Sequence, residues 1–194
     1  MKKSLLSILF LLLIATTAQA QIVNIPDAKF KKRLLTYIPK IDLNSDGQIQ
    51  VSEAQMVTKL FVEDRNIANL TGIEAFTALT QLNCSGIRLT TLDVTKNTAL
   101  TLLHCNFNSL TTLDVTNNTA LVDLECDINS LTTLDVTNNT ALNWLYCNDN
   151  PTLSIICLTP TQLGLTVSDA RYWKKYASAT WSTTCTNGIE ALKH

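Results

Sequence analysis

A spacing of 21 residues recurs through the middle of this chain. The string Asn-Thr-Ala-Leu begins at Asn97, Asn118 and Asn139, and full copies of one unit run over residues 100–120 and 121–141. Leucines and cysteines keep the same spacing, at Leu82, Leu103, Leu124 and Leu145 and at Cys84, Cys105, Cys126 and Cys147. A single short coil cannot bury its apolar face alone, so a repeated coil stacks on its own copies. The repeat predicts a solenoid.

The sequence pattern of the unit, which begins L-x-x-L-x-C-x-x-N-x-L, indicates the leucine-rich repeat class. In Leu103-His104-Cys105 apolar and polar residues alternate, as in a short strand with one buried face. A more loosely matching coil, with Leu60-Phe61-Val62 as its strand, precedes the others. We therefore expect an α/β solenoid over residues 57–153 with about five parallel strands, near residues 60, 82, 103, 124 and 145.

The six cysteines fall into two groups. Four occupy one inward slot of the repeat, where the alternatives are a metal or redox cluster and a ladder of small buried side chains. Metal sites need shorter spacings such as C-x-x-C, so we expect the ladder. Cys157 and Cys185 lie outside the period and are the expected disulfide of an exported chain, within a C-terminal cap over residues 154–194.

Residues 1–20 have the pattern of a signal peptide. Lys2 and Lys3 precede an apolar run over residues 5–14, and Ala18-Gln19-Ala20 forms a cleavage site, so the mature chain begins at Gln21. The alternative is a membrane anchor, for which the run is too short. We expect no membrane span and a secreted or cell-surface protein, with the periplasm as the other location. A net charge of −1 argues against a nucleic-acid ligand.

Residues 42–53 match every slot of an EF-hand calcium loop. A helix over residues 26–37 enters the loop, and Ser52 with Gln55 forms a capping box for an exiting helix. A solvated acidic turn is the alternative. We expect one structural Ca²⁺ that braces an N-terminal cap over residues 21–56. Its ligands are Asp42, Asn44, Asp46, Gln48 through its backbone carbonyl, Gln50 through water, and Glu53 through both carboxylate oxygens.

The outward strand positions differ between coils whose framework is nearly identical. The first column is Gln81, Leu102, Asp123 and Trp144, the second is Asn83, His104, Glu125 and Tyr146, and the third is Ser85, Asn106, Asp127 and Asn148. A uniform framework with a varied face is what a binding scaffold needs. The candidate ligand-binding residues are Leu102, His104, Asp123, Glu125, Asp127, Trp144 and Tyr146. Two alternatives remain: the C-terminal cap covers the aromatic pair, and the acids are a solvated face or collect a cation.

Three classes of function compete. The leading hypothesis is a non-enzymatic recognition module that binds a protein or glycan through this face, as a monomer or weak dimer. An enzyme is disfavoured, because His104 and His194 are the two histidines and no nucleophile, zinc or phosphate-loop motif is present. The alternative to recognition is a cell-envelope structural or accessory protein without a specific ligand.

Residues 57–153, with units such as LTTLDVTNNTALVDLECDINS, resemble the 21-residue cysteine-bearing leucine-rich repeat of the internalin J-like proteins of Listeria. Similar repeats occur in exported leucine-rich repeat proteins of the Bacteroidetes. The segment NIPDAKFKKRLL resembles the N-terminal segment of the latter, and Cys157 and Cys185 match their cap cysteines. The resemblance implies a leucine-rich repeat fold and a secreted or surface location, as for adhesins and virulence factors.

Overall fold

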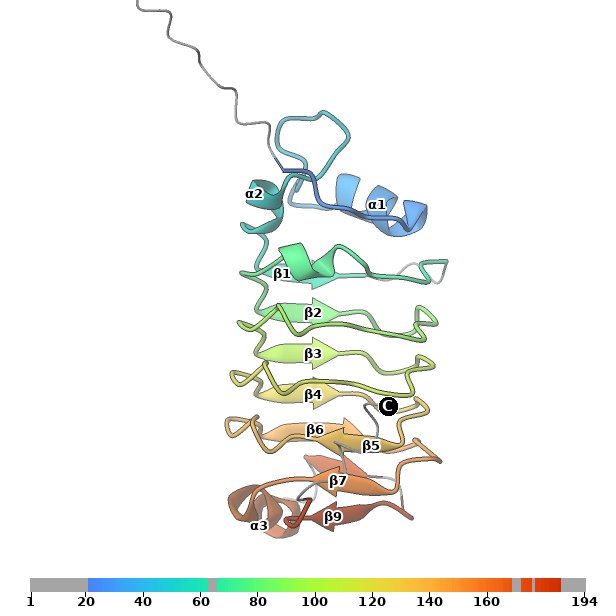
Figure 1. Ribbon diagram of the computed structural model, residues 1–194, viewed down its shortest axis with the longest axis vertical. Helices are drawn as coiled ribbons and strands as arrows, with labels where there is room; N and C mark the ends of the chain where they lie inside the picture. Colours follow the sequence, from blue (N-terminus) through green and yellow to red (C-terminus); the bar gives the residue numbers. More distant parts are fainter. Residues whose placement is uncertain (1–20, 63–65, 169–171, 176, 186–194) are drawn as a thin grey trace, which may run out of the picture.

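The computed structural model describes residues 21–62, 66–168, 172–175 and 177–185 (Figure 1). The expected signal peptide, residues 1–20, lies outside this part of the chain. No helix within the described ranges is both long enough and apolar enough to pass through a bilayer.

A six-stranded parallel sheet runs the length of the solenoid, with its strands stacked along the long axis of the molecule (Figure 1). Its order is β1-β2-β3-β4-β6-β8, and the bounds are Lys59–Phe61, Gln81–Asn83, Leu102–His104, Asp123–Glu125, Trp144–Cys147 and Trp173–Lys175. The first five strands lie where the repeat predicts them. The sixth, β8, comes from the C-terminal segment and pairs with β6, and the repeat contains no sign of it.

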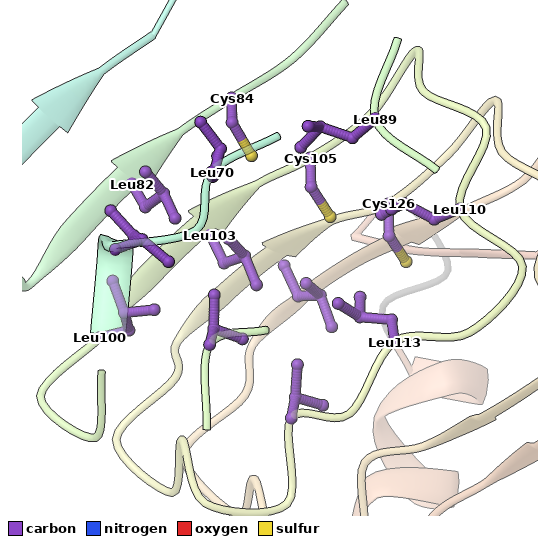
Figure 2. Packing of buried hydrophobic residues seen from close by; sticks show 14 of the residues in the cluster. Leu70, Leu82, Cys84, Leu89, Leu100, Leu103, Cys105, Leu110, Leu113 and Cys126 are labelled. Atoms are coloured by element: carbon purple, nitrogen blue, oxygen red, sulfur yellow. The ribbon is translucent and has the colours of Figure 1, made fainter. Parts of the chain in front are cut away.

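The register of the main sheet follows the repeat. Leu82 pairs with Leu103, and Leu103 with Leu124, so residues 21 apart are partners. The first coil is one residue longer, and Leu60 pairs with Leu82. Cys84, Cys105, Cys126 and Cys147 are free thiols that are fully buried. Figure 2 shows three of these thiols beside the stacked leucines, which confirms the expected ladder of small buried side chains.

A second, three-stranded parallel sheet has the order β5-β7-β9, with bounds Thr133–Asp135, Ile155–Cys157 and Thr180–Ser182. Leu134 pairs with Ile156, and both are buried. Leu113, Val115 and Val136 are buried as the repeat predicts. The described coils over residues 57–153 contain strands, turns and one short 3₁₀ helix, η1 (Ile73–Ala75), while the α-helices lie in the caps. The repeats are therefore a β-solenoid of about five turns.

Buried asparagines bond the backbones of neighbouring coils. The Nδ2 of Asn129 donates to the carbonyls of Cys105 and Cys126, and its Oδ1 accepts from the backbone N–H of Leu110. Asn108 and Asn150 repeat this arrangement. Where the first cysteine coil has Ile87, that side chain is fully buried and the ladder starts one coil later. These amides satisfy backbone groups that a tight coil would otherwise leave unpaired.

A second asparagine ladder runs along the opposite side of each coil. The Nδ2 of Asn118 donates to the carbonyls of Val94 and Asn97, and Asn97 and Asn139 do the same in their coils. In the C-terminal cap the Nε2 of Gln162 continues this ladder by donating to the carbonyls of Val136 and Asn139. Gln162 lies on α3 (Pro160–Ser168), so this helix closes the last coil.

The N-terminal cap contains α1 (Ala28–Leu35) and α2 (Val51–Ala54). The Asp27 carboxylate caps α1 by accepting from the N–H groups of Lys29 and Phe30, and it also accepts from Ala68 and Asn69 in the first coil. Burial disfavours the charge on Asp27, but these backbone donors outweigh burial and lower the pKa of the carboxyl. One side chain thus caps α1 and attaches the cap to the solenoid.

The expected capping box of Ser52 with Gln55 is wrong. The N-cap of α2 is Gln50, whose backbone N–H donates to the Glu53 carboxylate at 2.9 Å. The helix therefore starts two residues earlier than expected from that box. It spans only four residues before the chain enters β1.

The disulfide expected between Cys157 and Cys185 is present and links β7 to the residue stretch that follows β9. Trp173 and Trp181 pack edge to face beside it in the cap, with ring centroids 6.1 Å apart. The C-terminal cap is thus held by a covalent link, by two strand pairings and by the Gln162 amide.

Candidate binding face and calcium loop

The solvent-facing side of the main sheet, called the concave face in leucine-rich solenoids, carries the varied columns. Pairing of β3, β4 and β6 places Leu102, Asp123 and Trp144 in one row. The same pairings place His104, Glu125 and Tyr146 in a second row. All of these side chains are partly exposed, whereas the leucine between them in each strand is buried. The structure therefore brings together the candidate residues as the repeat predicts.

His104 lies between two carboxylates of the next coil. Its Nε2 is 3.2 Å from Asp123 Oδ2, and its Nδ1 is 3.8 Å from Glu125 Oε2. Burial disfavours the charged ring, but the hydrogen bond that the ring donates to the Asp123 carboxylate and the charge of Glu125 outweigh burial and raise the pKa of His104. The potential ligand atoms of the three residues all lie within 4.8 Å of one another, so the group has the donors of a metal site.

The carboxylates of this face lie close enough to repel one another, and the charge of His104 offsets this repulsion only in part. Burial raises the pKa of Glu125, and the charges of Asp123 and Asp127 add to this effect while His104 opposes it. Burial also raises the pKa of Asp127, with a further contribution from the charge of Asp149. Partly desolvated carboxylates that repel one another are stabilised by a cationic group placed against them.

The aromatic part of the face is partly covered by the C-terminal cap. Tyr172 packs edge to face on Trp144, with ring centroids 5.7 Å apart, but Trp144 keeps 38% of its surface exposed. The outcome lies between the two alternatives considered from the sequence. Strand β8 also places Lys174 opposite Tyr146, which sequence reasoning missed. No repeated spacing connects residue 146 to residue 174, so only the fold shows that they are neighbours.

The loop over residues 42–53 is folded around its own acidic side chains. Asp42 accepts from the N–H groups of Ser45 at 2.7 Å and Gly47 at 3.1 Å. Glu53 closes the loop by accepting from the N–H of Leu43 at 2.8 Å. Gly47 has a φ of 76°, as the sharp turn at this position requires. Residues 21–23 pair with the end of the loop through the antiparallel bridge between Ile22 and Gln50.

The donor set of this loop fits a hard cation. Asp42 and Glu53 are 6% exposed, and the described residues hold no salt bridge to either one. Asp46 Oδ2 accepts from Asn44 Nδ2 and Gln50 Nε2, so positions three, five and nine of the loop are tied together. Gln50 is 4% exposed, and its buried Oε1 has no hydrogen-bond partner among the residues that the structure describes. Buried charges and orphaned oxygens are costly unless a cation or water satisfies them.

Two cavities in the described surface lie near these sites, one of them lined in part by Leu43 and Glu53 of the loop over residues 42–53. One cavity of about 630 Å³ lies on the side of the coils away from the main sheet, lined by framework residues such as Asp93, Asp114 and Asp135. Another, of about 490 Å³, lies in the N-terminal cap beside Ile38, Met56 and Phe61. Neither is lined by the outward residues of β3, β4 or β6. Those residues present an open surface, which suits a macromolecule better than a small molecule.

No protein-family model matches the sequence, and no curated protein matches it. Solved structures do. The functional domain of InlJ from Listeria monocytogenes, described as including a cysteine ladder, is 29% identical with a TM-score of 0.53, over 73% of this chain and 38% of that one. An internalin from the same species, InlF, is 19% identical with a TM-score of 0.53, over 83% of this chain and 59% of that one.

Internalin C2 of Listeria monocytogenes is 16% identical with a TM-score of 0.50, over 87% of this chain and 92% of that one. The chain spans less than two thirds of the length of InlJ and InlF. By structural similarity, the chain is an internalin-like leucine-rich repeat β-solenoid with a C-terminal disulfide.

Proposed function

We propose that this internalin-like solenoid is an exported, non-enzymatic recognition module that binds a protein or glycan ligand through its concave face. The observation that carries the proposal is the contrast within one sheet. The buried leucines of β2, β4 and β6 are identical, whereas the outward residues change from neutral and polar on β2 through acidic on β4 to aromatic on β6. Carboxylates beside an exposed tryptophan suit a basic protein surface or a sugar ring. The disulfide supports export, because disulfides persist in oxidising compartments.

The test is a binding screen with residues 21–194 in calcium against arrays of glycans and extracellular proteins. The wild type is compared with a Trp144→Ala/Tyr146→Ala double variant, which removes the two aromatic side chains from the face. Thermal unfolding is measured for both proteins. A ligand that binds the wild type and not an equally stable variant supports the proposal. Absence of any ligand, with both proteins folded, contradicts it and favours the structural or accessory role in the cell envelope.

The second part of the proposal is that the loop over residues 42–53 binds a structural Ca²⁺. The side chains of Asp42, Asn44, Asp46 and Glu53 and the carbonyl of Gln48 would hold the ion, with Gln50 contributing through water. Support comes from the two buried carboxylates without a salt bridge and the unpartnered Oε1 of Gln50. The ion would neutralise these charges and brace the cap over the first coil.

Removal of calcium should lower the melting temperature. We expect a chelator to destabilise the wild type, and about 1 mM calcium to restore it, because extracellular calcium modules bind at about 10⁻⁴–10⁻³ M. An Asp42→Asn variant should melt at one temperature with and without calcium. The matched control is Asp93→Asn, on a framework turn far from the loop. If the wild type melts identically in chelator and in calcium, the loop is not a calcium site.

A further inference from the structure

One slot of each coil holds a left-handed residue at the border of the concave face. It directly follows the third outward column and is occupied by Gly86, Phe107, Ile128 and Asp149 in successive coils. Their φ angles are 68°, 55°, 50° and 53°. A Cβ built on Gly86 would lie 4.0 Å from the Cβ of Phe107, so neighbouring slots are in contact. We call these four positions the rim column.

Phe107 and Ile128 are poor residues for this conformation. A positive φ is uncommon for any residue with a side chain and is an outlier for a bulky or β-branched one. Glycine adopts it freely, and the chain has glycine in the same slot of the preceding coil. Two coils thus carry backbone strain that a smaller residue would relieve.

Burial in the core does not account for the strain. Phe107 is 55% exposed and Ile128 is 37% exposed, whereas the inward leucines of the same coils are fully buried. Because these side chains stay exposed, they gain little from folding, and nothing from apolar burial offsets the backbone strain. Strain of this kind is found where a binding function requires it.

The surroundings of this apolar pair are acidic. Asp127 directly precedes Ile128, and Asp149 occupies the next position of the rim column. Glu125, the last residue of β4, is the outward residue that precedes Asp127 in the same coil. Two exposed apolar side chains bordered by carboxylates complement a polypeptide segment that carries both apolar and basic side chains.

We propose that Phe107 and Ile128, together with Asp127 and Asp149, extend the binding face onto its rim and accept a basic, amphipathic polypeptide segment. Apolar side chains of the segment lie on Phe107 and Ile128, and its lysines or arginines meet the two aspartates. This inference rests on the proposed function, because it names the partner class and the border of the same binding face. It makes the partner a polypeptide and not a glycan.

The test uses residues 21–194 and a labelled synthetic peptide of alternating lysine and leucine as the probe. Two further probes alternate lysine with serine and glutamate with leucine, and binding is followed by fluorescence anisotropy at about 0.15 M salt, where weak surface attraction is screened. We expect the lysine–leucine peptide to bind at least about tenfold more tightly than either of the others.

The informative variant is Phe107→Asn/Ile128→Asn, because asparagine tolerates the left-handed conformation. We expect a loss of about tenfold or more in affinity for the lysine–leucine peptide, with a melting temperature that is unchanged or higher. The control, Met56→Asn, removes a 59% exposed apolar side chain from the N-terminal cap and should leave binding unchanged.

The outcomes separate this inference from the proposed function. A variant that binds the peptide like the wild type, or that melts several degrees lower, overturns the rim proposal by showing that the pair is unused or structural. Suppose that the Phe107→Asn/Ile128→Asn variant still binds a ligand from the screen and that the Trp144→Ala/Tyr146→Ala variant does not. The concave-face proposal then stands without the rim. If the rim variant alone loses binding, the rim proposal stands and the aromatic pair is not part of the face.

Discussion

At the scale of single residues, the buried amides hold the coils together. Asn118 is fully buried, and its Nδ2 donates to the carbonyls of Val94 at 3.0 Å and Asn97 at 2.9 Å. Its Oδ1 has no partner among the described residues, so the two donated bonds are its contribution. The sequence marks the slot by repeating asparagine there. The sequence does not show which carbonyls receive the bonds.

We therefore expect Asn118→Ala to destabilise the protein by about 1–3 kcal/mol, because two buried hydrogen bonds are lost while the carbonyls of Val94 and Asn97 each keep one backbone N–H donor. Asn117→Ala is the matched control, since Asn117 is exposed and makes one bond of 3.2 Å to the carbonyl of Thr95. The control should cost about 0.5 kcal/mol or less. Urea unfolding of both variants measures the difference, and equal costs would contradict a role for the ladder.

The four ladder thiols should be inert in the folded protein. Burial raises the pKa of Cys84 and of Cys147 to about 12, and it raises the pKa of Cys105 and Cys126 well above the usual range. The thiolate is the reactive form, so a disulfide reagent at about pH 8 should modify none of them. In guanidinium all four should react. Rapid modification of any thiol in the native protein would contradict a packing role and favour redox chemistry.

At the scale of elements, β3 and β4 are coupled by a titrating side chain. The folded pKa of His104 lies above its unfolded value, so the folded state holds the proton more tightly. The stability from this interaction is fully present below the unfolded pKa of about 6.5 and is lost as the pH rises through the folded pKa. The raised pKa of Glu125 acts in the same direction, because the folded carboxyl is protonated more readily than the unfolded one.

The difference in free energy of unfolding between the wild type and His104→Gln should thus be larger at about pH 5.5 than at about pH 8. Urea unfolding at both values measures this difference. Asn106→Gln, at the next outward position of the same coil, is a control that removes no titrating group. A difference that does not change with pH would show that the histidine is not coupled to the carboxylates of β4.

The elements differ in how well the sequence predicts them. Strands β1, β2, β3, β4 and β6 follow from apolar alternation at a fixed spacing, and their pairing follows from the same spacing. Helix α1 is shorter than the expected 26–37, because Asp27 is its N-cap. The start of α2 at Val51 was missed, since a glutamine N-cap is a weak signal compared with serine.

At the scale of the whole molecule, the caps determine where the stack ends. A solenoid exposes an unpaired strand edge and an open core at each end unless other segments cover them. At the C-terminal end, β8 and β9 each add one strand to a sheet, and the disulfide fixes the segment that supplies them. The outward face of the main sheet therefore borders cap residues, with Tyr172 against Trp144 and Lys174 opposite Tyr146.

Removing the disulfide should loosen this end first. Cys157 and Cys185 are 28 residues apart, and on the chain-entropy model their link contributes about 3–4 kcal/mol. A Cys157→Ala/Cys185→Ala variant should melt at a lower temperature. It should also lose hydrogen-exchange protection at the N–H groups of Leu158 and Thr180, which bond β7 and β9. Uniform loss of protection across all coils would contradict a local role for the cap.

By itself, the sequence determined the number of regular coils, the pairing of the five repeat strands and the direction of each side chain in those strands. Residues 21 apart occupy equivalent places, and stacking equivalent coils leaves one register that buries the central leucine of each repeat strand. The tertiary structure alone decided the features without a period. These are the pairing of β8 with β6, the second sheet and the Gln162 cap. Each depends on segments that meet only once the stack has formed, so no local pattern encodes it.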